Sequence, residues 1–543
     1  MAPSKLKAGF VVWPNLLTTL IMSIMASYLT GAWELSITHA AAIVNLYSGV
    51  VGIMPVGMIC IVYMTGYMGS YWMILLSRFA YTAGLVLLAM STPPVLAGAT
   101  GTCSSYKAEC IGQVQKVLFY TSLPLIAVGV SAYLGSALTF IDELLPQTNP
   151  EQLPPPESEQ LPPPPESEQL PPPPESEQLP PPPEPEKLPP PAPAAEQLQP
   201  PASKKLPPKE VDKQITPESN GTSWAKFFKS EWFFGVISMI FFPGAALLAI
   251  GYINPWSIKF GIGAICTVVS TIIFLCGLRS FPRGRGAGQK PISLTKMFRK
   301  QDAKSILRLM PTCMTCILTG IVVSIGNTYF IEQATDMNPH VGRLLVPIIV
   351  LPICFQGYLK AYLANQIKWC AADPRFGIAV SKIIATLCCI TAAKVETRRL
   401  GVVRSEGLIE DDDEDTKKIS MTMFWLVPQF LLLGLAEELS EKSIVCFFTD
   451  KLEIKTPEED EATKESKNMY MKIFAQAVSG VGIICGVLSV YAVGETSARV
   501  GGSSWFQFTL NRSRLDNYYW TLAALTAINL VLDLLVRCVV FRD

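Results

Sequence analysis

Residues 40–64 read AAAIVNLYSGVVGIMPVGMICIVYM and contain no charged side chain. A helix needs about 20 consecutive apolar residues to cross the hydrocarbon core of a bilayer, and this stretch is long enough. Because hydrocarbon offers the backbone no water to bond with, only a structure that satisfies its own amides is stable there. The stretch therefore predicts a membrane-spanning helix.

Runs of this kind recur along the whole chain. We identify twelve, at about 8–30, 40–64, 71–93, 116–141, 231–253, 255–278, 304–328, 344–366, 376–394, 421–448, 469–493 and 518–540. The composition agrees, because 50% of the residues are hydrophobic and only 16% are charged, whereas soluble domains carry about 25% charged residues. We therefore predict an all-α membrane protein with 12 transmembrane helices.

A proline-rich insertion separates the fourth and fifth runs. The unit EQLPPPPES recurs about every nine residues from Glu151, and more than half of the prolines of the chain lie in residues 146–217. Proline removes amide donors and fixes φ, so we expect a disordered, extended segment. Two interpretations stay open: an acidic tether, or an arm that binds a protein partner with a proline-reading domain.

The basic residues of the loops predict the orientation. Lysine and arginine collect in cytosolic loops, and the loop after the sixth run is rich in both, which places that loop and both termini in the cytosol. The expected organisation is helices 1–4 (1–143), a cytosolic linker (144–225), helices 5–6 (226–280), a basic cytosolic loop (281–303) and helices 7–12 (304–543).

The cysteines indicate packing rather than metal binding. Cys313 and Cys316 form a lone CxxC inside an apolar run, without the second half of a zinc site, so we expect no metal and no other cofactor. Cys103 and Cys110 share a polar loop on the side opposite the basic loop. A disulfide and two free thiols both stay open for this pair.

Charged residues gather in the tenth run. Helical spacing places Glu437 over Glu441 and Glu438 over Lys442, since residues four apart are neighbours on a helix. Glu438 and Lys442 are expected to form an ion pair. Glu437 and Glu441 would repel, so one should bind a proton or a cation, and Lys360 in the eighth run can supply that cation. We predict a substrate site at Glu437, Glu441 and Lys360, because intramembrane ionisable residues mark function; snorkelling into water at the helix end stays the alternative.

Enzyme chemistry is not indicated. The only histidines, His39 and His340, are expected near external helix ends, and no GxxxxGK[ST] motif occurs, which leaves little for a catalytic triad or an ATP site. We expect Glu332, Asp336, His340 and Arg343 to lie solvated in the loop after the seventh run. The net charge of zero predicts no nucleic-acid partner.

Several strings resemble the plant nitrate/peptide transporter family. They are AAAIVNLYSG (40–49), TYFIEQATDM (328–337), FWLVPQFLLLGLAEE (424–438) and LNRSRLDNYYW (510–520). The family belongs to the proton-dependent oligopeptide transporters of the major facilitator superfamily. The resemblance implies two six-helix bundles, a central site and alternating access.

The chain departs from the family at the positions used for proton coupling. The resemblance places a Glu-x-x-Glu-Arg triplet in the first span, and this chain has Val11, Pro14 and Asn15 at those positions. It places an acid and a base at the positions of Thr65 and Ser70, and a lysine at that of Leu134. At the position of Val323, one nitrate-transporting member has a histidine. The tenth-span glutamate is kept as Glu437. These changes disfavour nitrate and leave proton coupling open.

The resulting hypothesis is a secondary transporter of a small organic solute (peptide, hormone or glucoside-like) in the plasma or vacuolar membrane. The alternative is a non-transporting membrane scaffold or sensor whose residues 146–217 bind a partner. A channel is less well supported, because no segment resembles a selectivity filter.

Overall fold

The computed structural model describes residues 4–65, 70–136, 244, 249–253, 255–276, 300–357, 360, 362, 373–408, 418–451 and 461–540. All of these residues belong to one compact unit. The predicted proline-rich linker, most of the predicted basic loop and most of the fifth predicted span lie outside the described residues.

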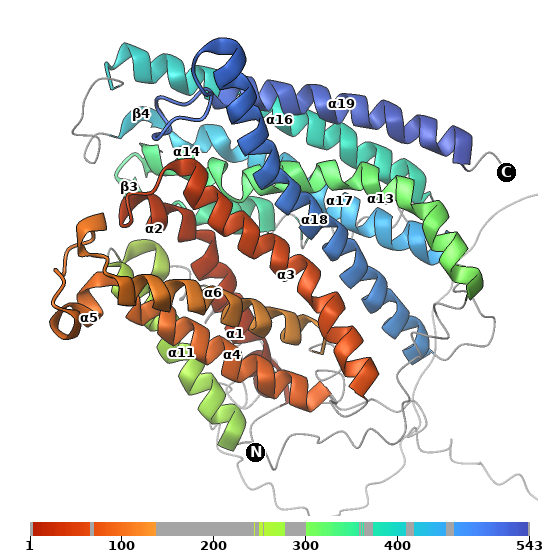
Figure 1. The fold of residues 1–543 in the computed structure, drawn as a ribbon, viewed down its shortest axis with the longest axis horizontal. Coiled ribbons are helices and arrows are strands. Elements are labelled where there is room, and N and C mark those ends of the chain that lie inside the picture. Colours follow the sequence, from red (N-terminus) through yellow and green to blue (C-terminus); the bar gives the residue numbers. More distant parts are fainter. Residues whose placement is uncertain are drawn as a thin grey trace, which may run out of the picture. The chain divides into compact units, whose positions relative to one another are not determined.

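The helices of the first half pack against one another (Figure 1). They are α1 (Ser4–Ser23), α2 (Met25–Gly31), α3 (Ile37–Thr65), α4 (Ser70–Met90), α5 (Pro93–Thr100), the 3-10 turn η1 (Ala108–Cys110), α6 (Gln113–Leu134) and α11 (Trp256–Cys276). Helix α4 contacts both α6 and α11, and α1 also lies against α11.

A second group of helices forms the other half. It comprises α13 (Lys300–Gly326), α14 (Tyr329–Asp336), the π-helical segment η4 (Leu351–Gly357), α16 (Pro374–Ser405), the 3-10 turn η6 (Met423–Leu426), α17 (Val427–Lys451), α18 (Glu461–Gly501) and α19 (Leu515–Val540). Two small sheets join the connecting segments: β1 (Met337–Asn338) pairs in parallel with β4 (Ile419–Thr422), and β2 (His340–Val341) pairs antiparallel with β3 (Leu344–Leu345).

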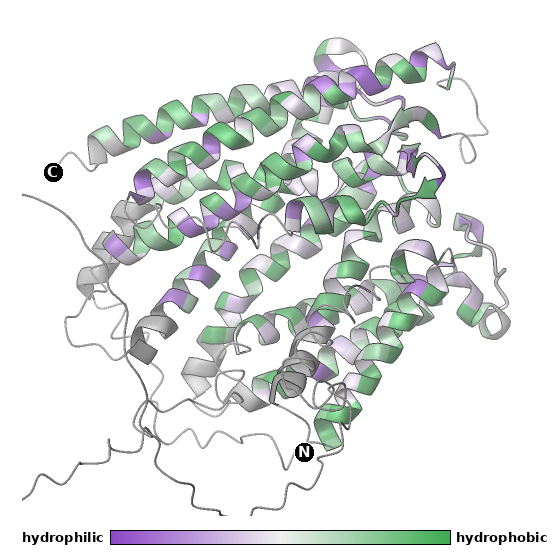
Figure 2. Ribbon diagram, turned by 180° about the vertical axis from the view of Figure 1, so that it is seen from behind, coloured by the Kyte–Doolittle hydropathy of each residue, from purple (hydrophilic) through white to green (hydrophobic). Residues whose placement is uncertain are grey.

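Nine helical segments among the described residues are long and apolar enough to cross a membrane. They correspond to nine of the twelve predicted spans, all except the first, fifth and eighth. Figure 2 shows hydrophobic residues along most of each long helix. The predicted class, an all-α multi-pass membrane protein, is confirmed, while the total of twelve helices stays a prediction.

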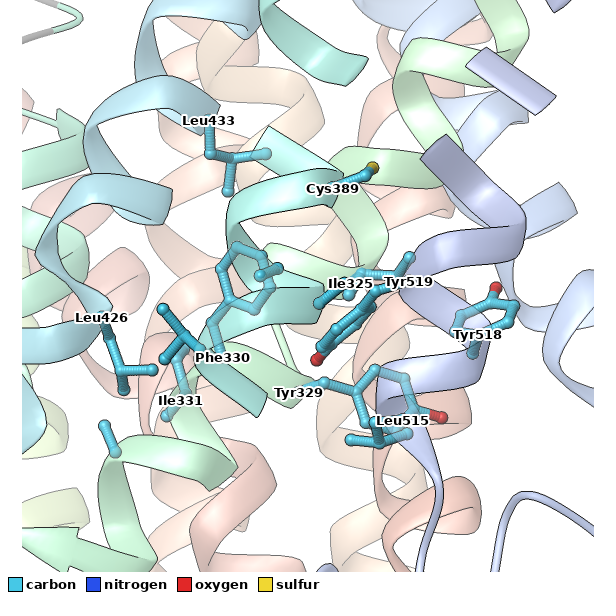
Figure 3. Packing of buried hydrophobic residues seen from close by; sticks show 14 of the residues in the cluster. Ile325, Tyr329, Phe330, Ile331, Cys389, Leu426, Leu433, Leu515, Tyr518 and Tyr519 are labelled. Carbon is cyan, nitrogen blue, oxygen red and sulfur yellow. The ribbon is translucent and has the colours of Figure 1, made fainter. Parts of the chain in front are cut away.

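Each half has its own apolar core. In the first half, Leu29, Leu85 and Phe119 are among the buried residues of one cluster. In the second half, Phe330 of α14 packs edge-on against Tyr519 of α19, with ring centroids 5.9 Å apart, and Figure 3 shows both rings within this cluster. The two cores also share members across the halves, because the first cluster includes Ile349 and the second includes Ile37 and Ala41 of α3.

The two halves approach most closely where α3 lies against α18. A Cβ atom on Gly480 of α18 would lie 2.7 Å from the carbonyl oxygen of Gly49 and 3.1 Å from the Cα atom of Gly52 on α3. The first distance is too short for a Cβ atom and the second is tighter than most Cβ contacts, so glycine at position 480 lets the two backbones meet this closely. Small residues give membrane helices this kind of close approach.

Helix α16 is longer than the sequence predicted. The ninth span was expected to end near residue 394, but the helix continues to Ser405. The extension contains Glu396 and Arg399, which form an ion pair at 2.7 Å with both side chains fully buried. A scan for apolar residues stops at these charged side chains. The helix itself continues, because the two charges neutralise one another inside the protein.

Candidate functional site

A cavity of about 210 Å³ lies between the two halves. Of the residues described, the first half contributes Ser48, Val51, Gly52 and Leu134 to its wall. The second half contributes residues of α13, α17 and α18 together with Lys360. Both groups of helices therefore form the same cavity.

The three residues predicted as a substrate site all line this cavity. The Lys360 Nζ atom lies 2.8 Å from Glu437 Oε1 and 3.7 Å from Glu441 Oε2. Gln356 donates a second hydrogen bond, of 3.3 Å, from its side-chain nitrogen to Glu437 Oε2. Lys360 thus lies where a cation was expected beside the two glutamates. Binding of a solute by these residues remains a prediction.

Glu437 and Glu441 reach one cavity because they lie one turn apart on α17. The second ion pair of the helix lies away from the cavity lining: Lys442 Nζ is 3.9 Å from Glu438 Oε1. This geometry agrees with the pairing expected from the sequence. The carboxylates of Glu437 and Glu441 therefore line the cavity, and the carboxylate of Glu438 does not.

The remaining wall is uncharged among the described residues. Leu134 and Val323 both line the cavity, although the resemblance places a lysine and a histidine at these positions. Hydroxyl and amide groups come from Ser48, Thr319, Ser440, Gln476 and Ser479. The charged residues of the described lining therefore all lie on one side of the cavity, which belongs to the second half.

Glu332 was predicted to be solvated in a loop, and this prediction is wrong. The residue lies in α14 and is only 6% exposed. It accepts hydrogen bonds from the Ser27 hydroxyl at 3.2 Å and from the Thr30 hydroxyl at 3.1 Å, both in α2 of the first half. The helix resumes at Tyr329 directly after α13 and carries Glu332 back into the protein. His340 and Arg343 are exposed, as expected.

Two further hydrogen bonds join the halves near Glu332. The hydroxyls of Ser27 and Thr335 lie 3.1 Å apart, and the Asn45 side-chain nitrogen donates to Thr328 Oγ1 at 3.3 Å. Together with Glu332, these groups form a polar contact between α2, α3 and the α14 region. We call this set (Ser27, Thr30, Asn45, Thr328, Glu332 and Thr335) the polar latch.

A buried ion pair positions the helix that forms one cavity wall. Lys382 Nζ of α16 lies 3.0 Å from Asp533 Oδ1 of α19, and the two side chains are 2% and 0% exposed. Lys382 also donates to Thr315 Oγ1 at 2.8 Å. Thr315 directly precedes Cys316, which lines the cavity. The pair therefore holds α13 against α16 and α19.

Cys103 and Cys110 are joined as a disulfide in the structure, with Cα atoms 4.8 Å apart. Their Cα separation lies in the usual range for a disulfide. Oxidation of this pair in the native protein stays a prediction. No cluster of three or more His, Cys, Asp or Glu side chains that could hold a metal ion occurs among the residues described.

Comparison with known proteins identifies relatives over almost the whole chain, although no family model matches it. Protein NRT1/PTR FAMILY 5.5 of Arabidopsis thaliana is 26% identical over 592 aligned residues, which cover 94% of this chain and 91% of that protein. Protein NRT1/PTR FAMILY 5.13 of the same plant is 22% identical, with 94% and 87% covered. A crystal structure of an auto-inhibited POT family peptide transporter superimposes with a TM-score of 0.55 at 12% identity, covering 98% of this chain and 96% of the other. The homologues are thus NRT1/PTR family proteins and the fold is that of POT family transporters, which confirms the resemblance found in the sequence.

Proposed function

We propose that this homologue of the NRT1/PTR family proteins is a secondary transporter that moves a small organic solute across a membrane by alternating access. The observation that carries the proposal is the cavity between the two halves, lined on one side by Lys360, Glu437 and Glu441. A site shared by two bundles is the arrangement from which rocking of one bundle against the other exposes a solute to either side. The relatives are transporters rather than enzymes or scaffolds, so neither catalysis nor the scaffold alternative is favoured.

Two carboxylates bear on proton coupling. Glu437 is bonded to Lys360 within the second half, so its charge is balanced whether or not the halves separate. Glu332 bonds only to hydroxyl groups of the first half among the described residues. A group whose surroundings change between the two facing states can couple protonation to transport. Glu332 meets this condition through its hydrogen bonds to the first half, whereas the ion pair of Glu437 lies within the second half.

The experiment is uptake by proteoliposomes that contain the purified full-length chain, with a panel of peptides, plant hormones, glucosides and small organic amines at acidic and neutral pH. The test variant is Glu437→Gln, and the matched control is Glu438→Gln, which removes the neighbouring carboxylate that does not line the cavity. We expect saturable uptake of at least one solute, abolished by the first variant and retained by the second. Absence of uptake for every solute, with folded protein in the vesicles, would refute the proposal.

We further place both termini in the cytosol of a plant cell, with the protein in the plasma or vacuolar membrane. Reporter fusions to the amino end and to the loop at residues 281–303 test the orientation. Reporters on opposite sides of the membrane would contradict it.

A further inference from the structure

The two cavity carboxylates differ in how their oxygen atoms are occupied. Glu437 accepts hydrogen bonds from Lys360 and from Gln356. Glu441 accepts none from any residue that the structure describes, and its two cationic neighbours, Lys360 and Lys472, both lie 3.7 Å away. Its side chain is 16% exposed and lines the cavity. Glu441 therefore presents a carboxylate whose hydrogen-bonding capacity remains for a bound solute.

The charge of the cavity selects the sign of the solute. Its described lining holds two carboxylates and one ammonium group, those of Glu437, Glu441 and Lys360. The remaining cation near Glu441 is Lys472, whose side chain is 58% exposed, so water screens its contribution. An anion entering the cavity would meet an excess of negative charge, whereas a cation would balance it.

Among the described residues, a second charge on the solute would find no partner. The part of the first-half wall that the structure describes consists of Ser48, Val51, Gly52 and Leu134, none of which is ionisable. Lys360, the one described cation of the lining, is already shared by two glutamates. A solute carboxylate would therefore lose its hydration without gaining an ion pair, which is costly.

From these contacts we infer that the transported solute is a small organic cation with one ammonium group and no carboxylate, and that Glu441 binds the ammonium group. This inference rests on the proposed transport function. The ammonium N–H groups donate to Glu441, the apolar part of the solute packs against Val51, Leu134 and Val323, and hydroxyl groups such as that of Ser48 bond to its other polar atoms. Lys360 acts as a specificity-determining residue, because it occupies Glu437 and leaves Glu441 as the acceptor.

Three compounds with one skeleton test the end group. Tyramine carries an ammonium group, tyrosol carries a hydroxyl group in its place, and 3-(4-hydroxyphenyl)propionate carries a carboxylate. Binding of each to the purified full-length chain in nanodiscs is measured by titration calorimetry. We expect tyramine to bind at least about tenfold more tightly than tyrosol, the size of one hydrogen bond to a charged group, and the carboxylate compound to bind most weakly.

Two variants with opposite expected effects connect the result to the site. Glu441→Gln should weaken tyramine binding by about tenfold and leave tyrosol binding within about twofold. Lys360→Gln should strengthen tyramine binding, because a second carboxylate then becomes available. Glu438→Gln, one residue from Glu437 and outside the lining, is the matched control and should change neither affinity. Thermal melting confirms that each variant is folded.

Transport completes the test. Proteoliposomes with an inside-negative membrane potential should accumulate tyramine above protein-free vesicles, since an ammonium ion carries its charge inward. Equal affinity for the three compounds, or an unchanged tyramine affinity in folded Glu441→Gln, would overturn the inference. If the chain transports only neutral or anionic solutes, the transport function stands and the ammonium inference fails. If it transports nothing in either panel, the proposed function fails as well.

Discussion

Replacing Lys382 by methionine should strongly destabilise the second half of the protein. The methionine side chain fills similar space but leaves the Asp533 carboxylate, which is fully buried, without the ammonium group now 3.0 Å away. Removing one partner of a buried ion pair costs about 3–5 kcal/mol. Thr315 would also lose the hydrogen bond that it accepts from Lys382. We therefore expect a loss of about 4 kcal/mol in the free energy of unfolding.

Equilibrium unfolding of the purified protein in mixed SDS and mild-detergent micelles measures this loss. The double variant Lys382→Met/Asp533→Leu should be more stable than either single variant, because no uncompensated charge remains in it. The control is Lys394→Met, the same substitution at an exposed position of α16, with an expected effect within about 0.5 kcal/mol. Additive losses in the double variant, or a Lys382 variant as stable as the control, would show that the ion pair does not hold these helices together.

Three further predictions concern the contact between the halves and the disulfide. Glu332→Gln should lower the rate of solute uptake and flatten its pH dependence, because the amide cannot change charge when the polar latch opens; uptake with an unchanged pH profile would contradict this role. Gly480→Ala should force α3 and α18 apart and lower both the melting temperature and the rate of uptake. The control is Gly57→Ala on α3, which has open space at its Cβ position and should change neither quantity. Equal behaviour of the two variants would argue against the glycine contact. Cys103 and Cys110 should resist maleimide labelling of the denatured protein until a reductant is added, and labelling without reductant would show that the thiols are free.

The sequence predicted most of the spans and placed two of the cavity carboxylates on one helix face, because both depend on local patterns. Apolar length alone identified most of the spans, since lipid permits few other structures. The spacing of Glu437 and Glu441 placed them on one helix face without any knowledge of the fold. The sequence offered Lys360 only as a candidate partner of these glutamates, because it is distant from them in the sequence. Its distance of 2.8 Å from Glu437 is a property of the tertiary structure.

The sequence did not predict polar groups whose partners are distant. In the last span the spacing alone offers Asp533 a neighbour on its own helix, Arg537 four residues on, whereas the cation found 3.0 Å away is Lys382 on another helix. Glu332 follows the end of α13, where charged residues usually meet water, but here the chain forms a second helix that brings the carboxylate to hydroxyl groups of α2. Such pairings depend on how the helices pack, which hydropathy and spacing do not encode.

The location of the charges also bears on how readily the two halves can separate. Among the described residues, every ion pair between side chains lies within the second half, and the contacts of the polar latch are hydrogen bonds of hydroxyl, amide and carboxylate groups. A neutral hydrogen bond contributes about 0.5–1.5 kcal/mol and one to a charged group about 1.5–3 kcal/mol, whereas breaking a buried ion pair costs about 3–5 kcal/mol. Separating the halves at the latch therefore breaks only the weaker class of contact, and the hydroxyl groups that it frees can bond to water. A carrier needs two facing states of similar free energy, and confining the strong contacts to one half lowers the free energy needed to leave the state described here through the latch.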